Sequence, residues 1–377
     1  MRVTPLRITP LRIVVAPDSF KGSLDAAAAA SAIGSGWRAV RPFDEVRLLP
    51  QADGGEGTLD AIAFAVPGSR RCPVGPVTGP DGRSVDGYWL SLPDGTAVVE
   101  LALSSGLPLM QSLDPLGATS RGLGEILVAA LCSGAPRLVI GLGGSASTDG
   151  GAGALRALGL ELFDSAGVPL PDGGSALARL ARADTTRLRP SPPEGVRLLS
   201  DVVAPLLGPH GAAAVYGPQK GATPAQVRAL DAALARWASV LAGAEAASIP
   251  GAGAAGGTAY GFLAAWGAAI ESGSAAIAEL TGFRAAAAST DVVITGEGRF
   301  DATSLTGKVV GHALSLPTKP GARRGVIAGS LAAATPEGVW TASLAELAGS
   351  LEAALDDPNR WLFAAGVEAA RTLGQGS

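Results

Sequence analysis

The segment RLVIGLGGSASTDGGAGALRAL, residues 137–158, limits the possible folds more than any other part of the chain. Its residues 138–140 are all apolar, which predicts a fully buried strand. The glycine and serine turn that follows offers short side chains and backbone amides, and a helix is expected to begin near Gly151 with its positive end toward the turn. The segment therefore predicts an α/β fold with an anion-binding loop. Asp149, the only charged residue between the two arginines of the segment, predicts a metal ligand or a base.

Length and charge restrict the class of protein. A chain of 377 residues with 47% hydrophobic content can form two domains with ordinary cores. A net charge of -4 argues against a broad nucleic-acid surface, which needs clustered Lys and Arg. Cys72 and Cys132 provide neither a disulfide framework nor a CxxC metal site, which favours a reducing compartment. We expect a cytoplasmic protein, monomeric or homodimeric, with no nucleic-acid or membrane partner.

The N-terminal segment predicts neither a signal peptide nor a membrane anchor, because Pro5 and Pro10 interrupt its apolar residues. The pentapeptide TPLRI occurs twice there, at residues 4–8 and 9–13, which indicates a duplicated extension ahead of the first strand.

Basic residues and histidines narrow the chemistry. The two histidines, His210 and His312, are too few for a histidine zinc site or a Ser-His-Asp triad, so a general base is expected to be a carboxylate. Lys21, Lys220 and Lys308 lie in the short glycine-bearing sequences FKGS, QKG and TGK. A compact ammonium group on a flexible stem suits a phosphate oxygen, although each lysine alone could equally be a solvated surface residue.

The order of predicted elements indicates two domains. Strands and helices alternate at both ends of the chain, whereas residues 72–100 carry the turn sequence PDG twice and predict an antiparallel meander. We therefore expect residues 1–70 and 286–377 to form a discontinuous Rossmann- or flavodoxin-like α/β domain. Residues 71–285 are expected to form an inserted α/β domain with a mixed sheet, and the active site is expected in the cleft between the two domains.

Polar residues cluster in loops that follow predicted strands, where open α/β sheets bind ligands. Ser23 is predicted to cap the first helix, with Asp25 in its first turn. Asp53 and Glu56 flank a glycine pair before a helix expected near Thr58, an arrangement that fits Mg²⁺ or a hydroxyl group, or else an ordinary turn with an acidic helix start. A strand predicted at residues 197–203 delivers Asp201, near its end, into a long loop, and a strand at 291–295 precedes Glu297, Arg299, Asp301 and Lys308.

The glycine loops partly match three known motifs: the dinucleotide fingerprint, the P-loop and the serine elbow. GLGGSA at residues 141–146 matches the dinucleotide fingerprint in spelling, but further residues separate it from the helix start, so a nicotinamide dehydrogenase is the alternative. TGK is not a P-loop, because Ala302 occupies the first glycine position. The serine elbow of hydrolases fails at Ser147. Glycine loops with lysines and isolated carboxylates fit phosphoryl transfer, which needs positive charge, Mg²⁺ and a base.

Six motifs in order, APDSFKGS, ADGGEGT, GLGGSASTDGGAGAL, GPQKGAT, PGAGAAGG and GEGRFD, resemble the bacterial glycerate kinase family, class I. The resemblance runs from Ile13 to beyond Lys308. It implies ATP- and Mg²⁺-dependent phosphorylation of D-glycerate, with 2-phosphoglycerate rather than 3-phosphoglycerate as the expected product. The chain departs from the family pattern at Ala204 and Phe300. A non-catalytic module that senses glycerate or nucleotide on the same scaffold is a further alternative.

The candidate site follows from these loops. We expect Asp18, Lys21, Asp53, Asp149, Asp201, Glu297 and Asp301 to line one cleft, with Asp149 or Asp201 as the base and Lys21 as the charge clamp. The predicted catalytic residues are Asp149, Asp201, Lys21 and Asp18. The predicted ligands of substrate and phosphate are Ser19, Ser23, Asp53, Gly54, Gly55, Gly143, Gly144, Ser145, Lys220, Glu297, Arg299, Asp301 and Lys308, and the predicted Mg²⁺ ligands are Asp53 and Asp301.

Overall fold

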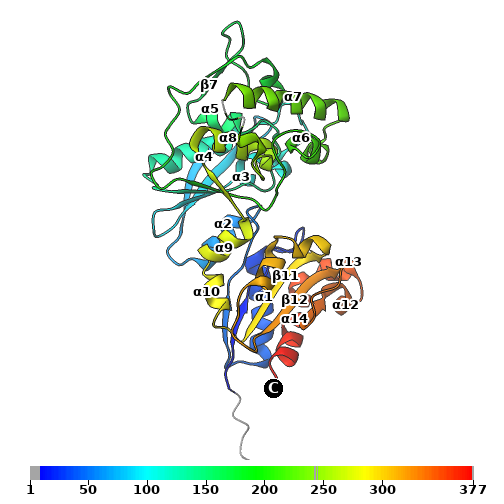
Figure 1. The fold of residues 1–377 in the computed structure, drawn as a ribbon. Helices are drawn as coiled ribbons and strands as arrows, with labels where there is room; N and C mark the ends of the chain where they lie inside the picture. Colours follow the sequence, from blue (N-terminus) through cyan, green and yellow to red (C-terminus); the bar gives the residue numbers. More distant parts are fainter. Residues whose placement is uncertain (1–8, 242, 244, 376–377) are drawn as a thin grey trace, which may run out of the picture. The chain divides into compact units, whose positions relative to one another are not determined.

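The structure, a computed structural model, describes residues 9–241, 243 and 245–375. The chain forms two compact units (Figure 1). The first consists of the described residues up to Ala52, residues 60–66 and the residues from Ser274 onward, and the second of residues 53–59 and 67–273. The first copy of TPLRI, residues 4–8, lies outside the described residues, and the second copy leads into the first strand.

The first unit contains a five-stranded sheet in which every pair of neighbouring strands is parallel. Its order is β13-β12-β11-β1-β2. The central strands β1, β11 and β12 each contain a short buried apolar run, as expected for a parallel sheet covered on both faces. The strands are β1 (Arg12–Val15), β2 (Glu45–Leu48), β11 (Val292–Phe300), β12 (Arg323–Leu331) and β13 (Val339–Ser343).

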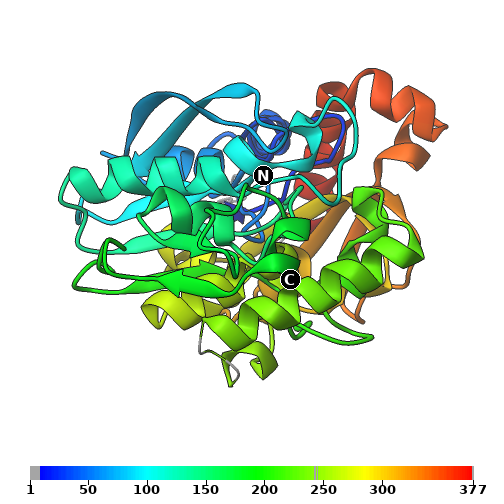
Figure 2. The same cartoon turned by 90° about the horizontal axis from the view of Figure 1, so that it is seen from above.

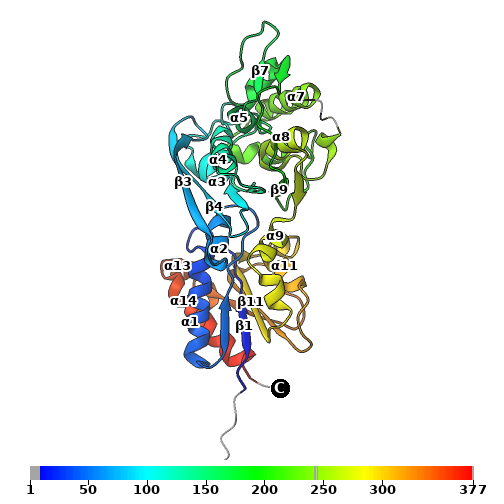
Figure 3. The same ribbon diagram turned by 90° about the vertical axis from the view of Figure 1, so that its left-hand side faces the viewer.

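Helices cover both faces of this sheet. Ile13 and Val15 pack with the residues of α1 and α14, which lie side by side in Figures 1 and 3, whereas Val14 packs on the opposite face against α10 and α11. Figure 2 shows the closing helices α12 to α14 in orange and red. The helices of this unit are α1 (Ala26–Val40), α9 (Gly273–Leu280), α10 (Phe283–Ala287), α11 (Val309–Ser315), α12 (Leu344–Ala348), α13 (Leu351–Asp356) and α14 (Pro358–Leu373), with the 3₁₀ turn η5 (Ala302–Leu305) and most of α2 (Thr58–Ala65).

Two local features of the first unit bear on the sequence predictions: the cap of α1 and the position of Phe300, where the chain departs from the family pattern. Helix α1 is capped by Asp25, whose side chain accepts from the amide of Ala28, so the prediction of Ser23 as the cap is wrong. The hydroxyl of Ser23 instead donates to the carbonyl of Phe20 within the preceding turn. Phe300 is completely buried against Val310 and its neighbours, which gives this larger side chain a packing role.

The second unit contains a six-stranded mixed sheet of order β10-β9-β6-β5-β4-β3. The first four strands are parallel, and β3 and β4 add the predicted antiparallel meander. The strands are β3 (Arg70–Thr78), β4 (Ser84–Ser91), β5 (Ala97–Glu100), β6 (Leu138–Gly141), β9 (Val196–Leu199) and β10 (Ala269–Glu271), with a separate antiparallel pair, β7 (Glu161–Phe163) and β8 (Arg182–Asp184).

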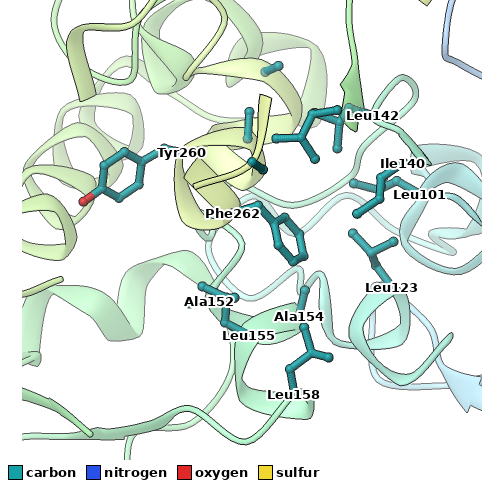
Figure 4. Close-up of a cluster of buried hydrophobic side chains, with 14 of the residues drawn as sticks. Leu101, Leu123, Ile140, Leu142, Ala152, Ala154, Leu155, Leu158, Tyr260 and Phe262 are labelled. Atoms are coloured by element: carbon teal, nitrogen blue, oxygen red, sulfur yellow. The ribbon is translucent and has the colours of Figure 1, made fainter. Parts of the chain in front are cut away.

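The core of the second unit forms where helices meet the strands. Leu123 of α4, Leu155 of α5 and Phe262 of α8 gather around Ile140 of β6 (Figure 4). Helices α4 and α5 approach closely because Gly124 faces the backbone of α5, where a Cβ would lie 2.2 Å from the carbonyl oxygen of Ala154. The helices are α3 (Ala102–Ser105), α4 (Arg121–Cys132), α5 (Ala152–Ala157), α6 (Ala212–Tyr216), α7 (Pro224–Val240) and α8 (Ala254–Trp266), with the 3₁₀ turns η1 (Leu107–Leu109), η2 (Gly174–Arg179), η3 (Pro218–Lys220) and η4 (Ala246–Ser248).

The predicted two-domain α/β class is confirmed by a parallel sheet in a discontinuous unit and a mixed sheet in the other. The predicted domain boundaries at 70/71 and 285/286 stay a prediction. Among the helices that the structure describes, none combines the length and the apolar character needed to span a membrane.

Candidate active site

In the second unit the predicted loops meet at one edge of the sheet. Strands β5, β6, β9 and β10 are parallel, so their carboxyl ends share that edge. The residues that follow them are Leu101, Leu142, Ser200 and Ser272. The turn at residues 53–57 lies against the same edge, because the carbonyl of Gly54 accepts from the amide of Gly143 at 3.0 Å.

Glycines make this close approach possible. A Cβ on Gly143 would lie 2.3 Å from the Cα of Gly55, and one on Gly273 would lie 1.9 Å from the carbonyl oxygen of Asp53. Any larger residue would push the backbones apart. The spacing of these loops therefore depends on the absence of side chains at these positions.

The two glycines of the central loop have different roles. The amide of Gly143 donates to the carbonyl of Gly54, and the role of Gly143 as a ligand of substrate or phosphate stays a prediction. Gly144 is exposed, has a φ of +77°, and its amide donates to no acceptor within the described part of the chain. The amide of Gly55 donates to Asp53 Oδ1 at 3.0 Å. Of these three amides, that of Gly144 is available to an anion.

Asp53 and Asp201 lie at this edge with part of their surface exposed. Asp201 Oδ1 accepts from the hydroxyl of Ser272 at 2.7 Å and from the amide of Gly273 at 3.0 Å. These two partners, which the sequence reading missed, fix the carboxylate after β9. The signal available in the sequence was the Ser-Gly pair directly after an apolar strand.

Asp149 is completely buried and is surrounded by donors. Its Oδ2 accepts from the amide and hydroxyl of Ser120 at 2.9 and 2.7 Å and from the amide of Gly153 at 3.2 Å, and its Oδ1 accepts from Gly151 at 3.2 Å. The Ser120 hydroxyl accepts in turn from the amide of Ala154. The carboxylate thus joins the N-terminal ends of α4 and α5 and holds the loop in place.

Lys220 is also buried, with 3% of its surface exposed. Its ammonium group donates to the carbonyl of Ser147 at 2.5 Å and to the hydroxyl of Ser145 at 3.5 Å. Ser145 is buried as well, and its hydroxyl donates to the same Ser147 carbonyl at 3.2 Å. Lys220 and Ser145, both predicted to bind phosphate, are therefore buried and donate to the backbone of the loop.

Glu100, at the end of β5, is a further carboxylate that fixes the site. It is 3% exposed, and its two oxygens accept from the amides of Gly57 and Leu59 at 3.2 and 3.1 Å. A carboxylate in this position satisfies free amides at the start of α2. Glu100 therefore anchors the turn that contains Asp53.

In the first unit the second set of predicted residues lies at the carboxyl ends of β1 and β11. The amide of Asp18 donates to the carbonyl of Gly296 at 2.8 Å, and a Cβ on Gly298 would lie 3.3 Å from the amide nitrogen of Lys21. The loop at residues 18–21 thus lies beside Glu297. Ser19 donates its amide to Asp18 Oδ1 at 2.6 Å, and the Lys21 side chain is exposed.

Glu297 is the carboxylate with the most unusual surroundings. Burial raises its pKa, while a hydrogen bond from Ser304 and the charges of Lys308 and Lys21 act in the opposite direction. Its Oε1 is buried and accepts no hydrogen bond from the described residues. A buried carboxylate oxygen without a donor is costly unless a ligand supplies one. The carboxylate can therefore receive a ligand hydroxyl.

The remaining predicted residues of the first unit surround η5. Asp301 caps this turn, because its Oδ1 accepts from the amide and hydroxyl of Thr303 at 2.9 and 2.7 Å, and these bonds lower its pKa. Arg299 and Lys308 are exposed. Lys308 donates to the Thr303 hydroxyl at 3.0 Å. The structure thus groups Asp18, Ser19, Lys21, Glu297, Asp301 and Lys308 in one unit and Asp53, Gly54, Gly55, Gly144 and Asp201 in the other; a common cleft for both groups stays a prediction.

The described residues contain no cluster of metal-binding side chains. Within residues 9–241, 243 and 245–375, no three His, Cys, Asp or Glu side chains converge in an arrangement that could hold a metal ion.

Comparisons with known proteins give a consistent result. The model of the glycerate kinase family matches residues 13–374. The glycerate kinase of Halalkalibacterium halodurans is 44% identical over 303 residues, which cover 78% of this chain and 79% of that protein. The glycerate 2-kinase of Escherichia coli K12 is 42% identical over 306 residues, 79% of this chain and 80% of that protein. A crystal structure of a protein assigned as glycerate kinase 2 from Salmonella typhimurium LT2 superposes with a TM-score of 0.81 at 35% identity, covering 97% of this chain and 98% of that one.

Proposed function

The chain belongs to the glycerate kinase family, and on this premise we propose that it transfers a phosphoryl group from ATP to D-glycerate. The observation that carries the proposal is the family match over residues 13–374, which spans both units. The reacting groups of such a transfer are anionic, and the loops of the two units offer isolated carboxylates, exposed lysines and the amide of Gly144, which has no acceptor among the described residues. This inventory fits positioning and electrostatic stabilisation, which dominate phosphoryl transfer.

We propose the C2 hydroxyl of D-glycerate as the acceptor. The support is the Escherichia coli relative, which is named a glycerate 2-kinase. The product would then be 2-phosphoglycerate rather than 3-phosphoglycerate.

We propose Asp201 as the general base. Of the two predicted candidates, Asp149 is completely buried and accepts four hydrogen bonds from the chain, so it cannot reach a substrate hydroxyl without losing them. Asp201 is partly exposed, and its Oδ1 is oriented by Ser272 and Gly273. An oriented carboxylate that accepts the acceptor proton contributes roughly 10²- to 10⁴-fold to the rate.

The charged groups of the first unit have complementary roles in this proposal. The exposed ammonium groups of Lys21 and Lys308 are available to phosphate or carboxylate oxygens. Glu297 offers its unpaired Oε1 to a hydroxyl group of either substrate. In the second unit, the free amide of Gly144 is available to one further anionic oxygen.

Asp53 is the residue that best fits a Mg²⁺ ion. It is partly exposed, and only its Oδ1 accepts a hydrogen bond from the described residues. Asp301 fits less well, because Oδ1 binds Thr303 twice and Oδ2 lies 3.9 Å from Nε of Arg299. Mg²⁺ is held in proteins by one or two carboxylates with water and substrate phosphates, so a single aspartate is compatible. When bound, the ion would neutralise phosphate charge.

The alternative functions have no support in the structure. Residues 147–151 separate the GLGGSA sequence from the start of α5 at Ala152, so the loop does not lead directly into a helix as in a dinucleotide fold. No observation favours a non-catalytic sensor. The two free cysteines and the use of ATP fit a cytoplasmic enzyme, and the choice between monomer and homodimer stays open to a direct measurement of mass.

The test is release of ADP from Mg-ATP in the presence of D-glycerate. We expect turnover with D-glycerate and none when it is replaced by 3-hydroxypropanoate, which lacks the C2 hydroxyl, or when Mg²⁺ is removed with a chelator. ADP release at the background rate by folded protein would refute the proposal. Oxidation of D-glycerate with NAD under the same conditions would favour the dehydrogenase.

A further inference from the structure

The loop at residues 143–149 accepts hydrogen bonds from a buried lysine, Lys220, which is distant in the chain. Of the four lysines, all of which lie in the described residues, Lys220 alone is buried. It ends the short turn η3 and reaches the Ser147 carbonyl at 2.5 Å. Burying an ammonium group is unfavourable unless nearby groups compensate its charge. The buried ammonium group of Lys220 therefore needs its hydrogen bond to the Ser147 carbonyl, and this bond restricts the conformation of the loop.

The compensating charge is Asp149. Burial lowers the pKa of Lys220 to about 8, and the charge of Asp149 acts in the opposite direction. The two groups are joined through the chain, since Lys220 binds the carbonyl of Ser147, two residues before Asp149. Asp149 itself is fixed by Ser120, Gly151 and Gly153.

Two side chains of the loop, those of Ser147 and Thr148, do not hold it in place. The hydroxyl groups of Ser147 and Thr148 are buried and have no hydrogen-bond partner within the described residues. The loop is instead held through its backbone by Lys220 and by the segment at residues 255–257. These three residues all have positive φ, and the carbonyl of Gly256 accepts from the amide of Gly150 at 3.0 Å.

The segment at 255–257 also limits where the loop can move. A Cβ on Gly256 would lie 2.1 Å from the carbonyl oxygen of Ser147, so the two backbones are in direct contact. That oxygen is the same atom that accepts from Lys220. Lys220 and Gly256 thus both contact one carbonyl oxygen, three residues along the chain from the exposed Gly144.

We propose that Lys220 is a positioning residue for the kinase reaction, which together with the buried Asp149 sets the conformation of the loop that presents Gly144. The ammonium group touches neither substrate and acts through Ser145 and Ser147. The inference rests on the proposed function only for its catalytic consequence, because the loop geometry belongs to the protein without ligand. Small displacements of positioning groups can reduce turnover by up to about 10²-fold, so loss of Lys220 should be visible in activity.

The experiment compares Lys220→Met, Asp149→Asn and the double variant with Lys319→Met as the matched control. Lys319 lies in the first unit, where it is paired with Asp291, whereas the loop belongs to the second unit. For each protein, hydrogen exchange of residues 143–151 is measured without substrate, and kcat and KM are measured with Mg-ATP and D-glycerate.

We expect Lys220→Met to exchange the 143–151 amides at least tenfold faster and to lose at least tenfold in kcat/KM, with Lys319→Met unchanged in both. Because each single variant leaves one buried charge without its partner, the double variant should lose less than the product of the two single losses. Exchange and kinetics of Lys220→Met within twofold of the wild type would overturn the inference, as would losses that simply multiply.

The outcomes separate this inference from the proposed function. A wild type that forms no ADP refutes the proposed function, while the exchange of the loop still decides the role of Lys220. An active wild type with an unaffected Lys220→Met refutes the inference alone. If Lys220→Met does not fold, recovery of folding in the double variant supports the charge pair, and failure to recover contradicts it.

Discussion

At the scale of single residues, Asp149 and Asp201 follow neighbouring strands of one sheet but have different surroundings. Asp149 is completely buried with four donors, whereas Asp201 is partly exposed and held by Ser272 and Gly273. The sequence offers the two carboxylates as equal candidates, because burial and hydrogen bonding depend on residues far away in the chain. Their separation into a structural and a chemical role therefore needs the structure.

Replacement of Asp201 by Asn should lower kcat at least 10²-fold with little change in stability. The amide oxygen can still accept from Ser272 and Gly273, but the group can no longer accept a proton. Steady-state kinetics and thermal unfolding measure the two effects. Asp149→Asn is the comparison and should lower Tm by several degrees, because an amide cannot accept all four bonds. A variant of Asp201 with wild-type kcat would assign the base elsewhere.

The pKa of Lys220 predicts a pH dependence of stability. In the folded protein this pKa is about 8, against 10.5 for an ordinary lysine. Between these values the unfolded chain holds the proton that the folded protein has lost, so unfolding binds a proton and rising pH favours the folded state. Relative to Lys220→Met, the wild type should gain about 1 kcal/mol or more in free energy of unfolding between pH 8 and 10.5. Urea unfolding across this range checks the sign, and an unchanged difference would show that Lys220 titrates normally.

At the scale of elements, the strands were predictable because their apolar runs are continuous. Predictions at residues 138–140, 197–203 and 291–295 each overlap a strand of the structure. Helix ends were harder, since both Ser23 and Asp25 can cap a helix and the fold of the preceding turn decides between them. The left-handed segment at residues 255–257 could not be predicted, because three successive left-handed residues leave no pattern in an Ala- and Gly-rich sequence.

The contact between α4 and α5 predicts a stability effect at Gly124. An added methyl group would lie 2.2 Å from the Ala154 carbonyl oxygen, and since that atom belongs to the backbone, one helix must move. Gly124→Ala should therefore lower the free energy of unfolding by about 1–3 kcal/mol, despite the better helix propensity of alanine. Chemical denaturation provides the measurement. A variant as stable as the wild type would mean that the helices are less closely packed than described.

At the scale of the whole molecule, the sequence predicted a discontinuous α/β unit interrupted by a mixed one, and both are present. This success depends on the alternation of strands and helices, which changes visibly at the meander. That the loops of the second unit meet at one edge of its sheet was predictable, because loops after parallel strands share one edge, whereas their role as a site stays a prediction. The surroundings of individual groups were not predictable. Gly143, Gly144 and Lys220 all lie in glycine-bearing loops, yet the amide of Gly143 donates a hydrogen bond, Gly144 is exposed with a free amide, and Lys220 is buried.

The central claim is that both units serve phosphorylation of D-glycerate at C2, and the proton-coupled ³¹P spectrum of the product tests it most directly. A phosphate ester at C2 neighbours a single proton, and one at C3 neighbours two. We predict a doublet that grows with time in the presence of Mg-ATP and D-glycerate and is absent with Asp201→Asn over the same period. A triplet would contradict the proposed position of transfer, and no new phosphate ester from folded wild-type protein would contradict the account as a whole.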